Sequence, residues 1–235
     1  MYIKTSTKTS LFIKISAYIL WVPVILSISF EIFTFSDWVY TYNWSRNNIS
    51  NNTGLSIAEL NHSSNSIKTY FKNDLEKIDT TITKNNNNYQ IFNEKEIDHM
   101  VDVKILIQKT LLFEKLGILL LTICLIILIY IKKLKKIEEI IRNIIIKSFL
   151  LWGLFLSIII VSMIVNFNYT FILFHKLLFR NDLWILNPRT DFLLMMFPQR
   201  FFLEIAIGIL ILFFIINIFI LSLIKIIKSK FQYFS

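Results

Sequence analysis

Long stretches without charged side chains constrain this sequence more than any other feature. The 27 residues 148–174 contain no Asp, Glu, Lys or Arg. A helix needs about 20 mostly apolar residues to cross the hydrocarbon core of a bilayer. The sequence predicts four membrane-spanning helices, at about 12–35, 111–131, 148–174 and 203–224.

The amino-acid composition agrees with a lipid environment. Hydrophobic residues form 55% and charged residues 17% of the 235, and 22 residues are Phe. A water-soluble domain of this size cannot hide so much apolar surface in one core. We therefore predict an all-α membrane protein with a single integral membrane domain, residues 1–235. Its remaining parts are a mostly helical extracytoplasmic insert (36–109), a cytoplasmic loop (132–147) and a short outer loop (175–202).

The distribution of Lys and Arg predicts the orientation. Twelve of them lie before the first span, in and beside the loop 132–147, and after the fourth span, against two acidic residues, Glu138 and Glu139. Segment 36–109 carries eight basic and nine acidic residues. Because short cytoplasmic segments are rich in Lys and Arg, both termini are expected in the cytoplasm and residues 36–109 outside the membrane. The net charge of +9 thus indicates membrane orientation, and we expect no nucleic-acid partner.

A cleaved signal peptide is an alternative interpretation of the first apolar stretch, because Lys-rich sequence precedes it and Ser27 and Ser29 form a weak small-residue site. The stretch is longer than a typical signal core and ends in Phe30, Phe33 and Phe35. Retaining it also gives the even number of spans that the charge pattern requires.

The insert is expected to combine loops with amphipathic helices. Two Asn clusters, 47–52 and 85–88, predict loops or turns. Between them apolar residues recur at steps of three and four, which predicts one or two helices. Asn93 followed by Glu96 is a helix-start signature, and this helix is expected to continue into the second span.

The three histidines, His62, His99 and His175, all fall on the predicted outer face. Glu96 and Asp102 are each three residues from His99 and would share its helical face. A carboxylate there can hold an imidazole in one tautomer, as a catalytic histidine requires. A surface histidine with ordinary charged neighbours is equally consistent with the spacing, and His62 is expected to be a loop residue.

Segment 174–202 concentrates polar groups among apolar and aromatic ones. Ionisable residues at membrane depth often mark function. An interfacial loop explains the same pattern, with aromatic residues at the lipid headgroups and Arg on lipid phosphates. The polar and aromatic residues considered for a site are His175, Arg180, Trp184, Asp191 and Arg200.

Several chemistries have no support. Cys124 is the single cysteine, which excludes a disulfide framework and Cys-pair redox chemistry. The sequence has no HExxH motif, phosphate-binding glycine loop or GxSxG elbow. A site of two His and one Asp is conceivable without diagnostic spacing, so no metal and no cofactor is predicted.

Two segments resemble the bacterial lipoprotein intramolecular transacylases, which are four-span membrane proteins. They are EKEIDHMVDVKIL (94–106) and FHKLLFRNDLWILNPRTDFLLMMFPQRFF (174–202), with a weaker match in TGLSIAEL (53–60). The chain departs from the family in its Asn-rich insert and in Gln199, where an acidic residue is common.

The resemblance implies a reaction at the outer leaflet. Family members move the sn-2 acyl chain of a diacylglyceryl-modified lipoprotein to the α-amine of its N-terminal Cys, giving the lyso-form. It also implies that His99 and His175 are catalytic and that diacylglyceryl-modified lipoproteins and membrane lipids are the partners. Our hypothesis makes His175 the base and His99 the group that stabilises the oxyanion or protonates the leaving oxygen, with these roles exchangeable. Supporting or substrate-binding roles are expected for Asp102, Arg180, Trp184, Asp191 and Arg200.

Two other classes of function stay open. A non-catalytic four-span protein that binds or senses an envelope partner would depend on apolar residues of the insert such as Leu60 and Phe71. A small transporter is less consistent with the sequence, because the spans lack the midplane charges that line such a path.

Overall fold

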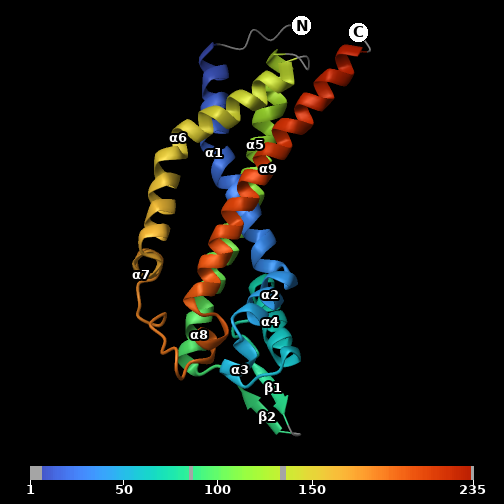
Figure 1. Cartoon of the computed structure of the whole chain (residues 1–235). Coiled ribbons are helices and arrows are strands. Elements are labelled where there is room, and N and C mark those ends of the chain that lie inside the picture. Colours follow the sequence, from blue (N-terminus) through green and yellow to red (C-terminus); the bar gives the residue numbers. More distant parts are fainter. Residues whose placement is uncertain (1–6, 85–86, 133–135, 234–235) are drawn as a thin grey trace. The chain divides into compact units, whose positions relative to one another are not determined.

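The computed structural model describes residues 7–84, 87–132 and 136–233 (Figure 1). Lys4, Lys133 and Lys135, which entered the orientation argument, and Asn85 and Asn86 of the second Asn cluster lie outside these residues. The chain divides into two compact units. Unit 1 comprises Met1–Phe30, Leu111–Val161 and Ile209–Ser235, and unit 2 comprises Glu31–Thr110 and Ser162–Gly208.

The described residues are predominantly helical, which confirms the predicted fold class. The helices are α1 (Thr7–Phe35), α2 (Asp37–Arg46), α3 (Ile49–Thr53), α4 (Ile57–Lys72), α5 (Glu94–Lys132), α6 (Ile137–Val165), α7 (Phe167–Leu178), α8 (Phe192–Met196) and α9 (Gln199–Tyr233). A short antiparallel hairpin of β1 (Thr81–Lys84) and β2 (Asn87–Gln90) pairs Thr81 with Gln90.

Four helices are long and apolar enough to cross a membrane: Lys8–Phe35, Glu94–Ile131, Ile137–Val165 and Gln199–Ile226. Helix α5 has 39 residues and a length of about 58 Å, whereas a bilayer core is about 30 Å thick. We take its charge-poor part, 111–131, as membrane-spanning. The helix runs from Glu94 to Lys132 without a break, so it continues into the second apolar stretch as expected. Its residues 94–110 belong to unit 2.

The third apolar stretch differs from its prediction. Residues 148–174 are divided between two helices, because α6 ends at Val165 and α7 begins at Phe167. Asn166 between them has extended backbone angles, and its side-chain oxygen accepts a hydrogen bond from the Tyr169 N–H at 3.0 Å. An N-terminal cap of this kind starts a new helix.

Unit 1 is held together by apolar packing around α1. Trp21, Val24 and Ile25 of α1 are buried against side chains of α5, α6 and α9. The opposite helix faces expose large apolar groups, with Phe12 72% and Leu154 76% exposed, as expected of surfaces solvated by lipid.

Two tryptophans supply hydrogen bonds within this packing. The Trp21 indole N–H donates to Asn217 Oδ1 at 2.8 Å, and the Trp152 indole N–H donates to the Ile19 carbonyl at 3.1 Å. Gly117 of α5 allows a close approach to α1, since a Cβ atom there would lie 2.6 Å from Val24 Cγ2. Small residues permit such approaches between membrane helices.

Unit 2 contains the predicted insert and corrects three local expectations. The first Asn cluster is partly helical, because Asn51 and Asn52 lie in α3. His62 lies exposed on α4, not in a loop. Asn87 and Asn88 of the second Asn cluster, expected in a loop or turn, lie in strand β2. The predicted amphipathic helix is α4, which starts with a reciprocal cap between Ser56 and Glu59.

An aromatic cluster packs the first helices of unit 2 against the chain around α8. Tyr40 and Trp44 of α2 contact the rings of Phe197 and Phe201. The Trp44 indole N–H donates to the Met196 carbonyl at 3.2 Å. These contacts fix α8, which forms one wall of the cavity described next.

Candidate active site

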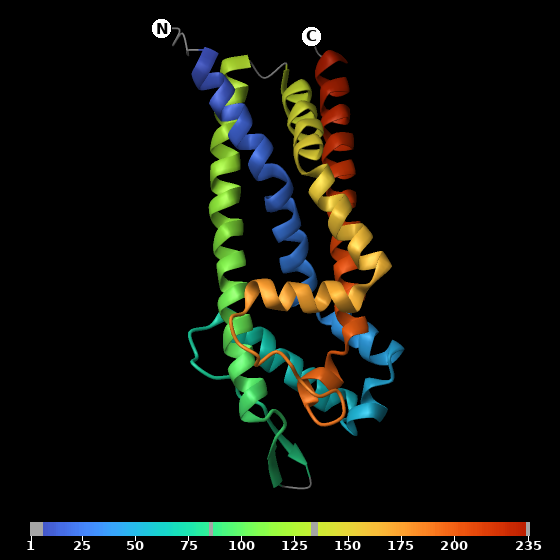
Figure 2. The same ribbon diagram turned by 90° about the vertical axis from the view of Figure 1, so that its left-hand side faces the viewer.

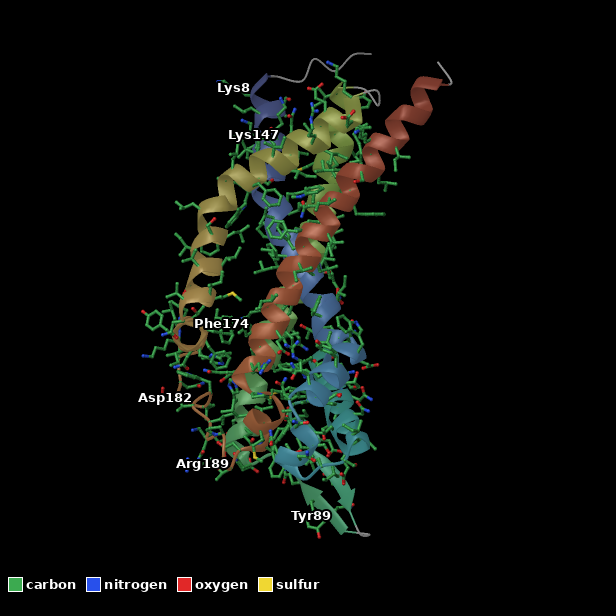
Figure 3. All side chains as sticks on the ribbon, viewed as in Figure 1. Lys8, Tyr89, Lys147, Phe174, Asp182 and Arg189 are labelled. Carbon is green, nitrogen blue, oxygen red and sulfur yellow. The ribbon has the colours of Figure 1, made fainter. Side chains whose placement is uncertain are left out.

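A cavity of about 400 Å³ in unit 2 is lined by both histidines of the two matching segments. His99 comes from α5 and His175 from α7, and the remaining lining is largely apolar. Figure 2 shows α7 and the non-helical segment after it in orange, beside the light-green start of α5. Figure 3 marks Phe174, Asp182 and Arg189 along this stretch. The other lining residues are Phe171, Ile172, Trp184, Ile185, Leu186, Pro188, Leu193, Leu194, Phe197, Pro198, Gln199 and Phe202.

His99 is positioned by the start of α5. The backbone N–H of Asn93 donates to Glu96 Oε2 at 2.7 Å, and the Glu96 N–H donates to Asn93 Oδ1 at 3.1 Å. This reciprocal cap confirms the predicted helix start. His99 follows Glu96 by about one turn and is 6% exposed, and its Nδ1 has no hydrogen-bond partner among the described residues.

His175 is held on α7 in a defined tautomer. Its Nδ1 lies 2.7 Å from the Phe171 carbonyl oxygen, which can only accept a hydrogen bond. Nδ1 therefore carries the proton of the neutral ring, and Nε2 keeps a lone pair. The ring is enclosed by aromatic neighbours, with centroid distances of 4.3 Å to Phe171 and 4.9 Å to Trp184.

The two imidazoles are close, although 76 positions separate them in the sequence. Their ring centroids are 6.1 Å apart. Phe179 contacts both rings, at 5.3 Å from His99 and 5.6 Å from His175. One small reacting group can therefore meet both histidines in the same cavity.

Burial keeps both imidazoles neutral near pH 7. It lowers the pKa of His99 to about 4, with a further decrease from His175, while the attraction of Asp102 opposes the shift. Burial also lowers the pKa of His175, against the effect of its hydrogen bond to the Phe171 carbonyl. A neutral imidazole has both an N–H donor and a basic nitrogen, so each ring can either accept or donate a proton.

Residues 14–202 match the family described as lipoprotein intramolecular transacylase Lit. This match covers well over half of the chain and both histidines. The chain belongs to this family. No curated protein sequence matches it significantly.

Solved structures of a Lit protein have the same fold. The in meso structure of the membrane integral transacylase Lit from Bacillus cereus has a TM-score of 0.77 and 22% identity, covering 98% of this chain and 100% of that one. A histidine-to-arginine variant of the Bacillus cereus protein has a TM-score of 0.71 and 22% identity, covering 97% and 96%. A histidine-to-alanine variant has a TM-score of 0.70 and 22% identity, covering 97% of both chains.

The other residues expected to support the site in this Lit family member have different placements. Trp184 lines the cavity, and its ring contacts the His175 ring at a tilt of 30°. Asp102 accepts a hydrogen bond from the Asn181 side chain at 2.8 Å and does not bond His99 Nδ1, so it affects His99 through charge alone. Asp191 accepts from the Asn187 N–H at 2.7 Å and thereby folds its own loop.

The two arginines are not part of the cavity wall. Arg200 donates to Glu204 at 3.0 Å on α9. Arg180 is exposed and has no hydrogen bond or ion pair within the described part of the chain. Neither is a lining residue of the cavity, so a contact of Arg180 with a lipid phosphate stays a prediction.

Sequence reasoning missed Phe171 and Phe179, and it noted Gln199 only as a departure from the family. Phe171 precedes His175 by one helical turn, a spacing that could have indicated the contact. Gln199 contributes an amide whose Nε2 donates to Asn168 at 2.7 Å. Among the described residues, no group of three His, Cys, Asp or Glu side chains is arranged to hold a metal ion.

Proposed function

We propose that this protein moves the sn-2 acyl chain of a diacylglyceryl-modified lipoprotein to the α-amino group of its N-terminal Cys. The observation that carries the proposal is the pair of neutral histidines, His99 and His175, facing one apolar cavity. Membership of the lipoprotein intramolecular transacylase family supports the substrate class.

The reaction requires one proton to move from nitrogen to oxygen. The neutral α-amine attacks the ester carbonyl, a C–N bond forms, and the C–O bond to the glycerol breaks. His175 accepts the amine proton, because its Nδ1–H is bound to the Phe171 carbonyl and its Nε2 is basic. The protonated His175 then gives this proton to the glycerol oxygen and returns to its neutral form, so the net change is acyl transfer without water.

His99 stabilises the negative charge that develops on the carbonyl oxygen. A donor in a site with little water is worth more than the same donor in bulk solvent, and removing one oxyanion donor costs about 10²–10³ in rate. In its neutral form the imidazole has one N–H for this purpose. It keeps this proton throughout, so that it is again a neutral donor when the intermediate collapses.

The cavity contributes by holding the two reacting groups together and excluding water. Amine and ester belong to one molecule, and correct orientation of such groups is worth about 7–11 kcal/mol. The apolar walls, among them Leu193, Leu194 and Phe202, suit an acyl chain. Water would otherwise hydrolyse the ester.

We place this site at the outer leaflet of the bacterial plasma membrane, with both termini in the cytoplasm. The excess of Lys and Arg beside the first, second, third and fourth spans supports this orientation. Residues 36–109 and 175–202 are then extracytoplasmic, and residues 132–147 are cytoplasmic.

Tandem mass spectrometry of a reporter lipoprotein tests the proposal. The reporter is produced in a host without endogenous N-acylation, with and without the wild-type protein. Substrate and product are isomers, so the N-terminal lipopeptide must be fragmented. We expect an N-acyl fragment with the wild type and none with His175→Ala or His99→Ala.

His62→Ala is the matched control, because it removes an exposed histidine of α4 that does not line the cavity. It should give the wild-type fragment pattern. An unchanged diacylglyceryl pattern with the inserted wild type would contradict the proposed function. Retained N-acylation in both cavity variants would contradict the assigned histidines.

A further inference from the structure

Glu96 is a buried carboxylate that the reaction scheme does not use. It is 1% exposed and lies about one helical turn before His99. Its Oε2 accepts from the Asn93 N–H as part of the helix cap. Its other oxygen, Oε1, accepts from the backbone N–H of Leu193 at 2.6 Å, a residue 97 positions away in α8.

The bond to Leu193 joins the two sides of the cavity. Leu193 is a lining residue of the cavity on α8, and His99 is a lining residue on α5. Hydrogen bonds from N–H groups to a carboxylate are short and about twice as strong as neutral ones. A buried N–H that loses such a partner destabilises the fold, so this bond holds α8 at a fixed distance from α5.

Further contacts join the first turns of α5 to the chain between α7 and α8. Lys95 Nζ donates to the Ile185 carbonyl at 2.5 Å, and Asn181 donates to Asp102 at 2.8 Å. These contacts lie toward solvent, where hydrogen bonds and ion pairs contribute little. The Glu96 bond is the fully buried one of this set.

We infer that Glu96 is a positioning residue of the transfer reaction, which holds the α8 wall of the cavity against the helix that carries His99. This inference rests on the proposed function. Glu96 does not line the cavity, so it acts through Leu193 and His99 and not on the substrate. A small displacement of catalytic groups is enough to lower a rate about 100-fold.

The chain contains a matched control for this inference. Glu59 forms the same reciprocal cap at the start of α4, where the Ser56 N–H donates to Glu59 Oε2 at 2.7 Å. Glu59 does not line the cavity, and its cap lies at the start of α4. Glu59→Gln and Glu96→Gln therefore disturb equivalent caps, and only Glu96→Gln also weakens the bond to the cavity wall.

The test measures kcat and KM of N-acylation by the wild type, Glu96→Gln, Glu96→Ala and Glu59→Gln in mixed micelles. Rates are expressed per folded molecule, with the folded fraction taken from thermal melts. We expect Glu96→Gln, which keeps one acceptor oxygen, to lower kcat on the order of tenfold with little change in KM. Glu96→Ala should lower it about 100-fold, and Glu59→Gln should match the wild type.

A second readout follows the bond itself. Amide hydrogen exchange of the peptide that contains Leu193 should accelerate in Glu96→Gln and stay unchanged in Glu59→Gln. If Glu96→Ala does not fold, the Gln variant decides. A wild-type kcat per folded molecule in Glu96→Gln, or equal losses in both Gln variants, would overturn the inference while the wild-type N-acyl product still supports the proposed function. A wild type without that product would overturn both.

Discussion

In unit 1, Trp21 and Asn217 share a hydrogen bond surrounded by apolar side chains, whereas in unit 2 the cavity walls are joined by polar contacts between distant segments. Apolar packing is spread over many weak contacts, so no single one sets a position. A hydrogen bond to a buried carboxylate fixes two groups to within a few tenths of an ångström. The comparison predicts that changes in unit 1 mainly affect stability and that changes near the cavity mainly affect rate.

The largest effect should come from His175→Phe. This change keeps a ring against Trp184 and Phe171 and removes both nitrogens. Loss of a general base should lower the rate of N-acylation by about 10²–10⁴ with little loss of stability. Single-turnover conversion of a reporter lipopeptide measures the rate, and a thermal melt measures stability. If the melting temperature falls so far that unfolding explains the whole loss of activity, the prediction that changes near the cavity mainly affect rate is wrong.

Gly117→Ala should have the opposite pattern. The added methyl would lie 2.6 Å from Val24 Cγ2, so α1 and α5 must separate. Overpacking of this kind costs about 1–3 kcal/mol of stability. Gly153→Ala is the control, because its Cβ would have no neighbour within 4 Å. Detergent-dependent thermal melts of both variants test this, and equal melting temperatures would contradict the close packing of α1 and α5.

The pH dependence of N-acylation should show histidines with lowered pKa values. The groups around His99 are His175 of α7 and Asp102 and Lys95 of α5. Because the pKa of His99 is about 4 and that of His175 is lowered, protonation of an imidazole should reduce the rate only below the ordinary pKa of 6.5, once the rate is divided by the fraction of neutral substrate α-amine, which is titrated separately.

The same shifts affect stability. Between pH 6.5 and about 4 the unfolded chain binds more protons than the folded one, so the contribution of the neutral histidines is complete above pH 6.5 and is lost as the pH falls toward 4. The two rings titrate as a pair, so the profile gives apparent values for both. A rate per neutral amine that still halves near pH 6.5 would contradict the buried environment.

The smallest effect is expected for Asn217→Leu. It removes the acceptor of the Trp21 indole N–H and puts an apolar side chain of similar size in its place, beside the unit 1 core. Hydrogen bonds between membrane helices average about 0.6 kcal/mol. A double-mutant cycle with Trp21→Phe, read by thermal melts, isolates this energy. A coupling above about 3 kcal/mol would show that unit 1 also depends on individual polar contacts.

Local patterns were sufficient for the parts of the site that lie along one helix. The Asn93–Glu96 cap was predicted because its two partners are three residues apart. The resemblance to the transacylases identified His99 and His175, both of which line the cavity. The break at Asn166 was missed, although an Asn within an apolar run is a possible helix cap.

The roles of the carboxylates could not be predicted in this way. Asp102 has the right spacing for His99 on the helix surface, yet its side chain bonds Asn181. Glu96 lies three residues before His99, as Asp102 lies three after it, and its side chain bonds Leu193 and not His99. Spacing along a helix says which residues share a face, but the partner across the interface depends on which segment packs there.

The sequence by itself determined the four apolar helices, the charge asymmetry at their ends and the helix start before His99, because these depend on residues a few positions apart. Only the tertiary structure decided that two histidines 76 positions apart share one cavity and that Glu96 joins its walls. Periodicity and capping are properties of neighbouring residues. The contact between α5, α7 and α8 depends instead on packing of the whole unit, which has to bury apolar surface and also give every buried N–H group a partner.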